Sequence, residues 1–266
     1  MLSRLANRIL APLSLRITRR PYNRFERLRT ATRRTRGEIS LHGKPFEYID
    51  EASFLHSYRE IFLDRIYDFP CESSSPRVVD LGANIGLSTL FFKQLYPDSA
   101  VTSVEADPAI FPVLQSNVAA AGVGNVELHH TAIHSDSQTL DFVQEGADAG
   151  RIALPEDYDA ECKMIQVQCR PIDAFLEQPV DFLKVDIEGV ETEAFEQCSR
   201  LDQVAAIFVE YHSFQTQAQS LPRLLDKLTG NGFRYAIRDQ FCTERPLRDR
   251  RTYSGMDLAL NIWAYR

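Results

Sequence analysis

Four residues between positions 80 and 105 have the types and spacing of a nucleoside-binding turn. In the segment VVDLGANIGLST, an apolar strand runs directly into a helical pattern, and Asp80, Gly82 and Gly86 form a DxGxxxG motif. Gly82 permits a tight turn with a close backbone approach, and the helix beginning near Gly86 offers unpaired N–H groups. The next strand ends at Glu105, whose carboxylate can accept hydrogen bonds from both ribose hydroxyls. Together these residues predict a nucleoside site.

The rest of the turn distinguishes between kinds of nucleoside. A dinucleotide fingerprint, GxGxxG, requires a glycine where this chain has Asn84, which tells against NAD. Ala83 and Asn84 complete the predicted cofactor loop, and a cationic sulfonium suits the nearby carboxylate of Asp80 better than a pyrophosphate does. After the third strand, Ala132 and Ile133 are placed to frame an adenine ring.

Acidic residues and a histidine follow the next two strands. Asp186 and Glu188 come where the fourth strand ends, and Glu210 and His212 come where the fifth ends. Because ligands of open α/β sheets bind beyond the carboxyl ends of the strands, these four side chains are expected at one pocket rim. Such a rim can hold a general base, and His212 and Asp186 are the candidate bases, with Glu188 and Glu210 beside them.

Other roles stay open for these residues. Asp186 could instead hold the methionine amino group of the cofactor or cap a helix beginning at Gly189. The three carboxylates and the imidazole could also bind a divalent metal, which we do not favour because their spacing specifies no coordination geometry. Lys184, within an apolar strand, is expected to pair with a carboxylate. Histidines at 129, 130 and 134 have no zinc-site spacing and are interpreted as strand or surface residues.

An alternating pattern of strands and helices must position these side chains. Apolar strands are predicted near 77–81, 100–104, 125–130, 180–185 and 204–211, with helices near 86–96, 108–121, 189–198 and 217–230. Such alternation predicts a parallel sheet covered on both faces. Two further strands, 233–238 and 258–265, are expected to form a terminal antiparallel pair. An inserted hairpin is predicted at about 139–170, with strands TLDFV and MIQVQC.

The chain divides into a basic start and an acidic body. Residues 1–36 hold eleven Arg and one Glu, a net +10, so the remainder of this 266-residue chain of net charge −7 carries −17. Leu2, Leu5, Ile9 and Leu13 make the start amphipathic, which is typical of contact with an anionic membrane surface or of a transit peptide. A helix covering the acidic body, or a homodimer partner, is equally open. Nucleic acid is not expected because the body offers no basic surface.

We therefore predict three regions: a basic extension at 1–36, a hairpin and a helix beginning at Ser53 that pack on the core at 37–76, and one α/β domain at 77–266. No apolar stretch is long enough to span a bilayer. The five cysteines are odd in number and lack CxxC spacing, which favours reduced thiols and a cytoplasmic protein, peripherally bound to a membrane if the extension binds one.

Two more segments carry a family resemblance. VDFLKVDIEGVETEAF at 180–195 and AIFVEYH at 206–212, together with VVDLGANIGLST and VEADP, resemble the FkbM-type methyltransferase family over about residues 40–240. The resemblance implies a Rossmann-like class I methyltransferase fold, with a mostly parallel seven-stranded sheet. It also implies S-adenosylmethionine as methyl donor and O-methylation of a sugar, a polyketide or a related secondary metabolite. Because the KxDxEG run matches the family, Asp186 is the preferred base.

Three functions follow, in order of preference. The first is a small-molecule or glycan O-methyltransferase, with the loop at 144–162 as a lid and Arg151 as a candidate substrate contact. The second is a catalytically silent methyltransferase-like module at a membrane or in an assembly, against which the intact Asp80, Gly82, Glu105 and Asp186 argue. The third, an NAD-dependent oxidoreductase, is disfavoured by Asn84.

Overall fold

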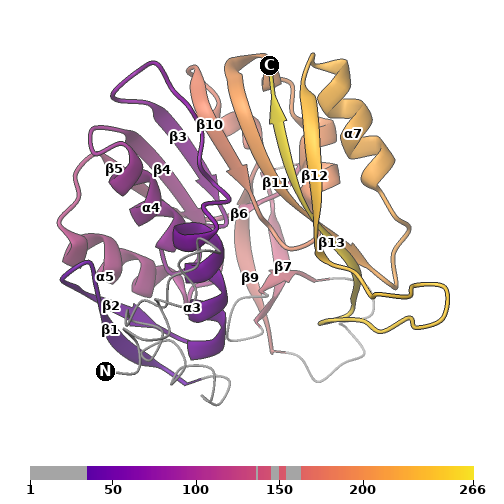
Figure 1. The fold of residues 1–266 in the computed structure, drawn as a ribbon, viewed down its shortest axis with the longest axis horizontal. Helices are drawn as coiled ribbons and strands as arrows, with labels where there is room; N and C mark the ends of the chain where they lie inside the picture. The colour runs from indigo at the N-terminus through magenta and orange to yellow at the C-terminus, as the bar shows by residue number, and fades with distance from the viewer. Residues whose placement is uncertain (1–34, 136, 145–149, 154–162) are drawn as a thin grey trace, which may run out of the picture.

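The main body of the protein is a seven-stranded sheet (Figure 1). The structure is a computed structural model and describes residues 35–135, 137–144, 150–153 and 163–266. In chain order the strands are β3 (Arg77–Leu81), β4 (Ala100–Glu105), β5 (Val126–His130), β10 (Val180–Val185), β11 (Val204–Phe214), β12 (Arg234–Phe241) and β13 (Met256–Tyr265). Their order across the sheet is β12-β13-β11-β10-β3-β4-β5. The predicted α/β fold, a mostly parallel seven-stranded sheet with a terminal antiparallel strand, is confirmed.

The strand directions put the carboxyl ends of five strands on one edge. β5, β4, β3, β10 and β11 are parallel, whereas β13 is antiparallel to both of its neighbours. β12 and β13 form the predicted antiparallel pair, and β13 lies between β11 and β12. Hydrophobic residues therefore alternate between two cores: Val78 faces one and Val79 the other.

Helices cover both faces of the sheet. α6 (Glu191–Gln197), α7 (Leu221–Gly230) and the 3₁₀ turns Ile172–Phe175 and Leu201–Gln203 lie over one core. α4 (Leu87–Leu95) and α5 (Phe111–Ala121) cover the other, where Phe92 is fully buried and Phe69 stacks on Phe182.

An N-terminal hairpin and helix extend that second core. β1 (Gly37–Leu41) and β2 (Lys44–Tyr48) form the hairpin, which is followed by α3 (Glu51–Tyr58) and a π-helical turn, η2 (Arg59–Leu63). The helix begins before the predicted Ser53, because Asp50 is its N-cap and accepts hydrogen bonds from the Ser53 N–H at 2.8 Å and the Ser53 hydroxyl at 2.9 Å. Figure 1 shows the hairpin beside α5.

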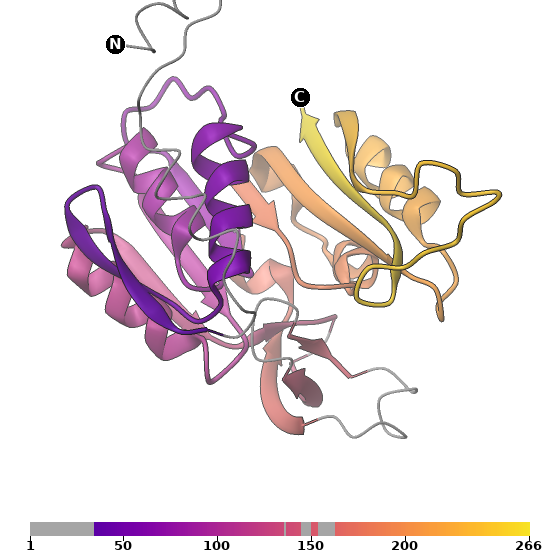
Figure 2. The same ribbon diagram turned by 60° about the horizontal axis from the view of Figure 1, so that its bottom comes forward.

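A small second sheet contains the predicted hairpin insertion (Figure 2). β7 (Thr139–Gln144) and β9 (Lys163–Arg170) pair antiparallel, β8 (Arg151–Ile152) pairs with β7, and β6 (Ala132–Ile133) pairs parallel with β9. The sequence did not reveal β6, because two residues carry no periodicity. Most of the loop predicted as a lid, and residues 1–34 of the basic extension, lie outside the described residues.

Within the described ranges, no helix combines the length and the hydropathy needed to cross a bilayer. Four described cysteines are free thiols, at 71, 169, 198 and 242, and Cys162 lies outside the described residues.

Asn117 joins the hairpin to the core, and its removal should destabilise the protein. Its side chain accepts a hydrogen bond from the Glu47 N–H at 2.7 Å and donates to the carbonyls of Glu47 at 2.9 Å and Ile85 at 2.8 Å. Asn117→Ala leaves these backbone groups without their partner, so we expect a loss of about 1–3 kcal/mol of unfolding free energy. The neighbouring Ser116→Ala, which loses one exposed contact to Glu47, should change it by less than about 0.5 kcal/mol. Equal denaturant midpoints for the two variants would contradict this.

Candidate active site

The turn after β3 depends on a close backbone approach at Gly82. Gly82 has φ of +81°, and a Cβ atom there would lie 1.8 Å from the carbonyl oxygen of Asp186. The N–H groups of Gly82 and Ala83 both donate to the carbonyl of Val104, at 2.9 and 2.8 Å, and thereby tie the turn to β4. Gly86, with φ of +94°, is the N-cap of α4. The predicted cofactor loop is therefore held between the ends of β4 and β10.

Glu105 lies at the end of β4 beside this turn. Its two carboxylate oxygens accept hydrogen bonds from the N–H groups of Asn84 at 2.9 Å and Asp107 at 2.8 Å. Burial raises the pKa of Glu105 to about 7, although both hydrogen bonds act to lower it. Each oxygen keeps a second lone pair, so the carboxylate can still accept hydrogen bonds from two ribose hydroxyls.

A cavity opens between this turn, Glu105 and the small sheet, and we call it the nucleoside cavity. Of the predicted cofactor residues, Gly82, Asn84, Glu105, Ala132 and Ile133 line it. Phe142 and Ile152 add an apolar wall from the small sheet, which sequence reasoning missed because no motif marks it. The combination of a close-packed glycine turn, a carboxylate and an apolar wall fits an adenosine.

Asp80 has a different position from the one predicted. Its carboxylate is fully buried behind the turn and lines no cavity described here, so the structure does not place it beside a sulfonium. It accepts hydrogen bonds from the hydroxyls of Ser88 at 2.6 Å and Thr89 at 3.2 Å, and lies 3.5 Å from the Lys184 ammonium. Asp80 therefore holds α4 and Lys184 in place. Gly86 also lies behind the cavities, where a Cβ atom would come 2.8 Å from Leu114.

Lys184 pairs with carboxylates, as predicted, and links the two halves of the site. Its buried ammonium donates to the carbonyl of Gly82 and lies 3.3 Å from Asp186 as well as 3.5 Å from Asp80. Burial acts to lower the pKa of Lys184, but Asp186 and Asp80 outweigh it, and the net shift is upward. Lys184 is thus a fixed positive charge beneath the cofactor turn.

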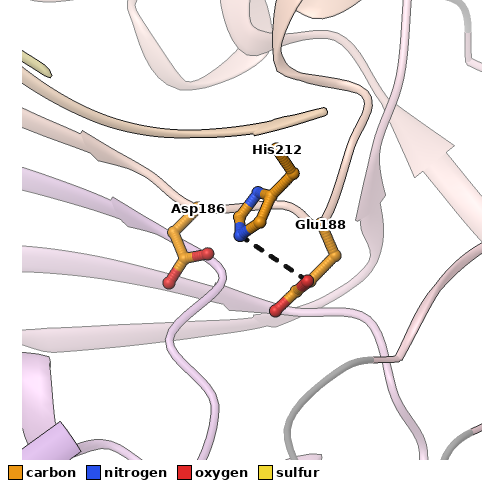
Figure 3. Close-up of side chains that lie close together, drawn as sticks. All are labelled: Asp186, Glu188 and His212. Carbon is orange, nitrogen blue, oxygen red and sulfur yellow. Dashed lines mark ion pairs between the residues drawn. The ribbon is translucent and has the colours of Figure 1, made fainter. Parts of the chain in front are cut away.

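The structure brings the four predicted reactive residues together. The imidazole of His212 points into the gap between the carboxylates of Asp186 and Glu188 (Figure 3). Its Nε2 lies 3.7 Å from Glu188 and 3.4 Å from Glu210. Glu188 has φ of +57°, a left-handed conformation that is costly for a residue with a side chain and is found disproportionately at functional sites.

A fifth residue, Glu191, completes this cluster. Its buried carboxylate accepts hydrogen bonds from the Gly189 N–H at 2.8 Å and from Nδ1 of His212 at 2.9 Å. Sequence reasoning missed Glu191, although its position three residues after Glu188 was a usable signal. Asp186 does not cap α6, which begins at Glu191 without a side-chain cap.

These contacts set the protonation of the cluster. Burial alone would lower the pKa of His212, but the negative charges of Glu188 and Glu191 and the hydrogen bonds to Glu191 and Glu210 raise it well above its ordinary value. Burial raises the pKa of Glu188 well above its ordinary value, and only His212 among its main neighbours opposes this rise. The carboxylates therefore favour the protonated form of His212, and burial makes the ionised carboxylate of Glu188 a stronger base than an exposed glutamate.

Two more cavities meet at the cluster. The central cavity lies between the cofactor turn and the α3–η2 segment, and it is lined by Lys184, Asp186, Glu188 and Glu210 from the sheet. The outer cavity, of about 420 Å³, is lined by Glu188, Glu210, His212 and residues of α3 and of the β12–β13 region. Glu188 lines all three cavities, whereas Asp186 lines the nucleoside and central cavities and His212 only the outer one.

The metal alternative has a geometric basis but no test. Ligand atoms of Asp186, Glu188 and His212 lie within 4.8 Å of one another, and within the described ranges no other group of three meets this criterion. These residues could hold a divalent cation if His212 gave up its proton. The metal stays an open alternative.

The remaining candidates lie elsewhere. The Arg151 guanidinium stacks over the ring of Phe214 at 5.3 Å and lines none of the three cavities, so the structure does not place it at a substrate. His129 lies 3.0 Å from Glu127, and the ring of His130 stacks on Phe111.

Comparison with known proteins places the chain in a family. The family described as Methyltransferase FkbM domain matches residues 80–235, which is more than half of the chain. The chain belongs to the FkbM methyltransferase family. Within the described residues, the FkbM match runs from Asp80 at the cofactor turn to the start of β12, and it includes all five residues of the cluster around His212.

Individual relatives are similar over parts of their lengths. The chain is 30% identical to Methyltransferase 1 of Beauveria bassiana (strain ARSEF 2860), over 58% of this chain and 70% of that protein. It is 30% identical to Methyltransferase sdnD of Sordaria araneosa, over 54% of this chain and 67% of that protein. The solved structure of an FkbM methyltransferase from Methylobacillus flagellatus KT is 18% identical with a TM-score of 0.48, and the similarity spans 73% of this chain but only 45% of that one.

Gly82 should tolerate no side chain. Gly82→Ala adds a left-handed alanine and a clash with the Asp186 carbonyl, so we expect a loss of about 3 kcal/mol or more of unfolding free energy. Gly122→Ala is the matched control: its φ is +68°, but nothing lies within 4 Å of the added Cβ. It should lose only about 1 kcal/mol. Chemical denaturation of both variants measures the difference, and similar losses would show that the close approach is not required.

His212 should stay protonated at neutral pH. Because its pKa is raised by carboxylates, we expect its ring to carry two protons above pH 6.5, as observed in ¹H–¹⁵N spectra of the imidazole. Glu191→Gln removes one of these charges and should lower the pKa of His212. Glu193→Gln, on the exposed side of the same helix, should leave it unchanged. A ring that loses its proton below pH 6.5 in the unmodified protein would contradict the charge arrangement.

Proposed function

We propose that this FkbM family member transfers a methyl group from S-adenosylmethionine to a hydroxyl oxygen of a sugar, polyketide or related small molecule, with Glu188 as the base. The observation that carries the proposal is the position of Glu188. It is the residue of the acidic cluster that borders the nucleoside, central and outer cavities together. A group at this junction can contact both an acceptor and a donor.

Binding of the cofactor relies on residues already placed. Glu105 would accept the ribose hydroxyls, Ala132 and Ile133 would pack on the adenine, and Gly82 would let the ligand approach the backbone. When bound, S-adenosylmethionine supplies an electrophilic methyl group on a positively charged sulfur. The acidic central cavity suits that charge, whereas the negatively charged phosphates of NAD would be repelled.

The acceptor would occupy the outer cavity. Glu188 and Glu210 can orient hydroxyl groups there, and the rings of Phe241 and Tyr253, 5.8 Å apart, offer an apolar surface of the kind on which sugar rings pack. This lining supports a polyhydroxylated acceptor. Binding also accelerates the reaction, because holding the acceptor oxygen in line with the methyl group removes much of the entropic cost of the reaction.

Glu188 removes the hydroxyl proton as the new O–C bond forms and the methyl carbon leaves sulfur. Proton removal of this kind contributes roughly 10²–10⁴-fold to a rate. The imidazolium of His212, held by Glu191, lies against Glu188 and stabilises its ionised form before reaction. The proton then stays on Glu188 until the products leave.

The structure changes which residue we favour as base. The sequence preferred Asp186, but its carboxylate is paired with Lys184 at 3.3 Å and does not border the outer cavity. The raised pKa of His212 favours its imidazolium form, in which both ring nitrogens carry protons and neither can accept one. Glu188 borders the outer cavity, and because burial raises its pKa, its ionised carboxylate is a stronger base than an exposed glutamate. We therefore propose Asp186 as a cofactor-binding residue and His212 as a positioning residue.

Glu188→Gln should abolish turnover while sparing cofactor binding. We expect release of S-adenosylhomocysteine, measured across a panel of sugars, macrolides and other polyols, to fall by roughly 10²–10⁴-fold. Calorimetric affinity for S-adenosylhomocysteine should change by less than about threefold. Glu196→Gln, an exposed change on α6, is the matched control and should retain full activity.

Two results would overturn parts of this proposal. If the unmodified protein bound neither S-adenosylmethionine nor S-adenosylhomocysteine, the chain would be a catalytically silent module. If Glu188→Gln kept full activity with an accepted substrate, the assignment of the base would be wrong, although methyl transfer itself would stand.

A further inference from the structure

Glu60 is an acidic residue of the central cavity that no part of the proposed reaction uses. It lies on η2, the π-helical turn that continues α3 across the carboxyl edge of the sheet. π-helical turns within helices are found frequently at functional sites, because the extra residue moves a side chain out of the regular helical row. Here the turn sets the Glu60 carboxylate in the same cavity as Asp186.

The charges around Glu60 are mostly negative. Asp186 and Glu210 face it from the sheet, and Asp64 and Arg59 lie on its own turn. Within the described residues Glu60 pairs with His56, at 3.2 Å, and the His56 side chain is 62% exposed. An exposed imidazole compensates a half-buried carboxylate poorly, because water screens the pair.

The buried lysine of the cavity cannot supply the missing charge. The Lys184 ammonium has three protons, and its contacts are the carbonyls of Gly82 and Leu81 and the carboxylates of Asp80 and Asp186. It is therefore fully engaged beneath the turn. Burial, followed by the charges of Glu210 and Asp186, raises the pKa of Glu60 to about 8. The groups around Glu60 in this cavity therefore carry more negative than positive charge.

We propose that Glu60 and Asp186 form a binding site for a primary ammonium group. Resting on the proposed function, this ligand is the α-ammonium of the amino-acid tail of S-adenosylmethionine. The position fits the tail, because the central cavity shares Gly82, Asn84 and Asp186 with the nucleoside cavity. A ligand whose ribose is held at Glu105 can therefore extend past the cofactor turn to reach Glu60.

The ammonium is a better ligand here than a metal. The three residues that come close enough to share a cation are Asp186, Glu188 and His212, and Glu60 is not among them. An ammonium needs only acceptors at hydrogen-bond distance, without fixed coordination, and the two carboxylates that line this cavity, from η2 and from the end of β10, can provide them.

The test compares two ligands that differ in the tail. S-adenosylhomocysteine carries the ammonium, and 5′-methylthioadenosine has the same nucleoside and sulfur without the amino-acid tail. Glu60→Gln should weaken calorimetric binding of S-adenosylhomocysteine by about tenfold or more, the loss expected when a hydrogen bond to a charged group is removed. Binding of 5′-methylthioadenosine should change by less than about twofold.

Asp64→Asn is the matched control. It removes a negative charge from the same segment, but Asp64 is half-exposed, pairs with Arg59 at 3.5 Å and lines no cavity described here. Its charge affects Glu60 less than the charges of Glu210 and Asp186 do, so the substitution should change both affinities by less than about twofold. Because Glu60 is repelled by its neighbours, Glu60→Gln should also melt no lower than the unmodified protein, so misfolding would not explain a loss of binding.

A second measurement detects the proton that Glu60 releases when the ligand binds. Glu60 is largely protonated at pH 7.5 when the cavity is empty and loses its proton when an ammonium binds, so affinity rises with pH up to about 8. Calorimetry in phosphate and in Tris buffer should show more proton release from the unmodified protein than from Glu60→Gln.

Two results with Glu60→Gln would overturn the ammonium site while leaving the proposed function intact. One is an equal loss of affinity for both ligands. The other is unchanged binding of S-adenosylhomocysteine together with unchanged proton release. Failure of the unmodified protein to bind either ligand would instead overturn the proposed function.

Discussion

One buried ammonium, that of Lys184, holds the two halves of the site together. It lies on β10 and bonds to the carbonyl of Gly82 on the cofactor turn, and it pairs with Asp80 beneath that turn and with Asp186 above it. An uncompensated buried charge is costly, so all of these contacts must form together. The close approach of Gly82 to Asp186, on which the shape of the nucleoside cavity depends, follows from this arrangement.

The balance of charge in the cluster around His212 is the second constraint on the structure of the site. Glu188, Glu191 and Glu210 surround one imidazole, and the resulting imidazolium is the positive charge that allows so many carboxylates to lie together. The arrangement is asymmetric: Glu191 is fully buried and fixes Nδ1, while Glu188 borders the cavities. Glu191 can therefore position the imidazole of His212, whereas Glu188 can exchange a proton with a ligand.

Much of this could be predicted from the sequence. The DxGxxxG turn, Glu105 and the strand-end pairs at Asp186 and His212 identify the cofactor turn and the reactive edge, because parallel strands bring their carboxyl ends together whatever the details of packing. The side-chain directions could not be predicted: Asp80 turned out to face Lys184, because the strand pleat points it into the core. Glu60 could not be predicted, since contacts between distant segments leave no local periodicity, whereas the short spacing from Glu188 to Glu191 was a usable signal. The membrane contact of residues 1–36 and a homodimer remain predictions.

The mechanism requires that Glu188 lies beside the sulfur of the bound cofactor, at the opening of the outer cavity. A crystal structure of the protein with S-adenosylhomocysteine tests this most directly. We expect the ribose hydroxyls on Glu105, the amino-acid tail in the central cavity, and the sulfur facing the outer cavity with the Glu188 carboxylate beside its opening. A sulfur directed away from Glu188, or a ligand bound outside the nucleoside cavity, would contradict the proposed mechanism.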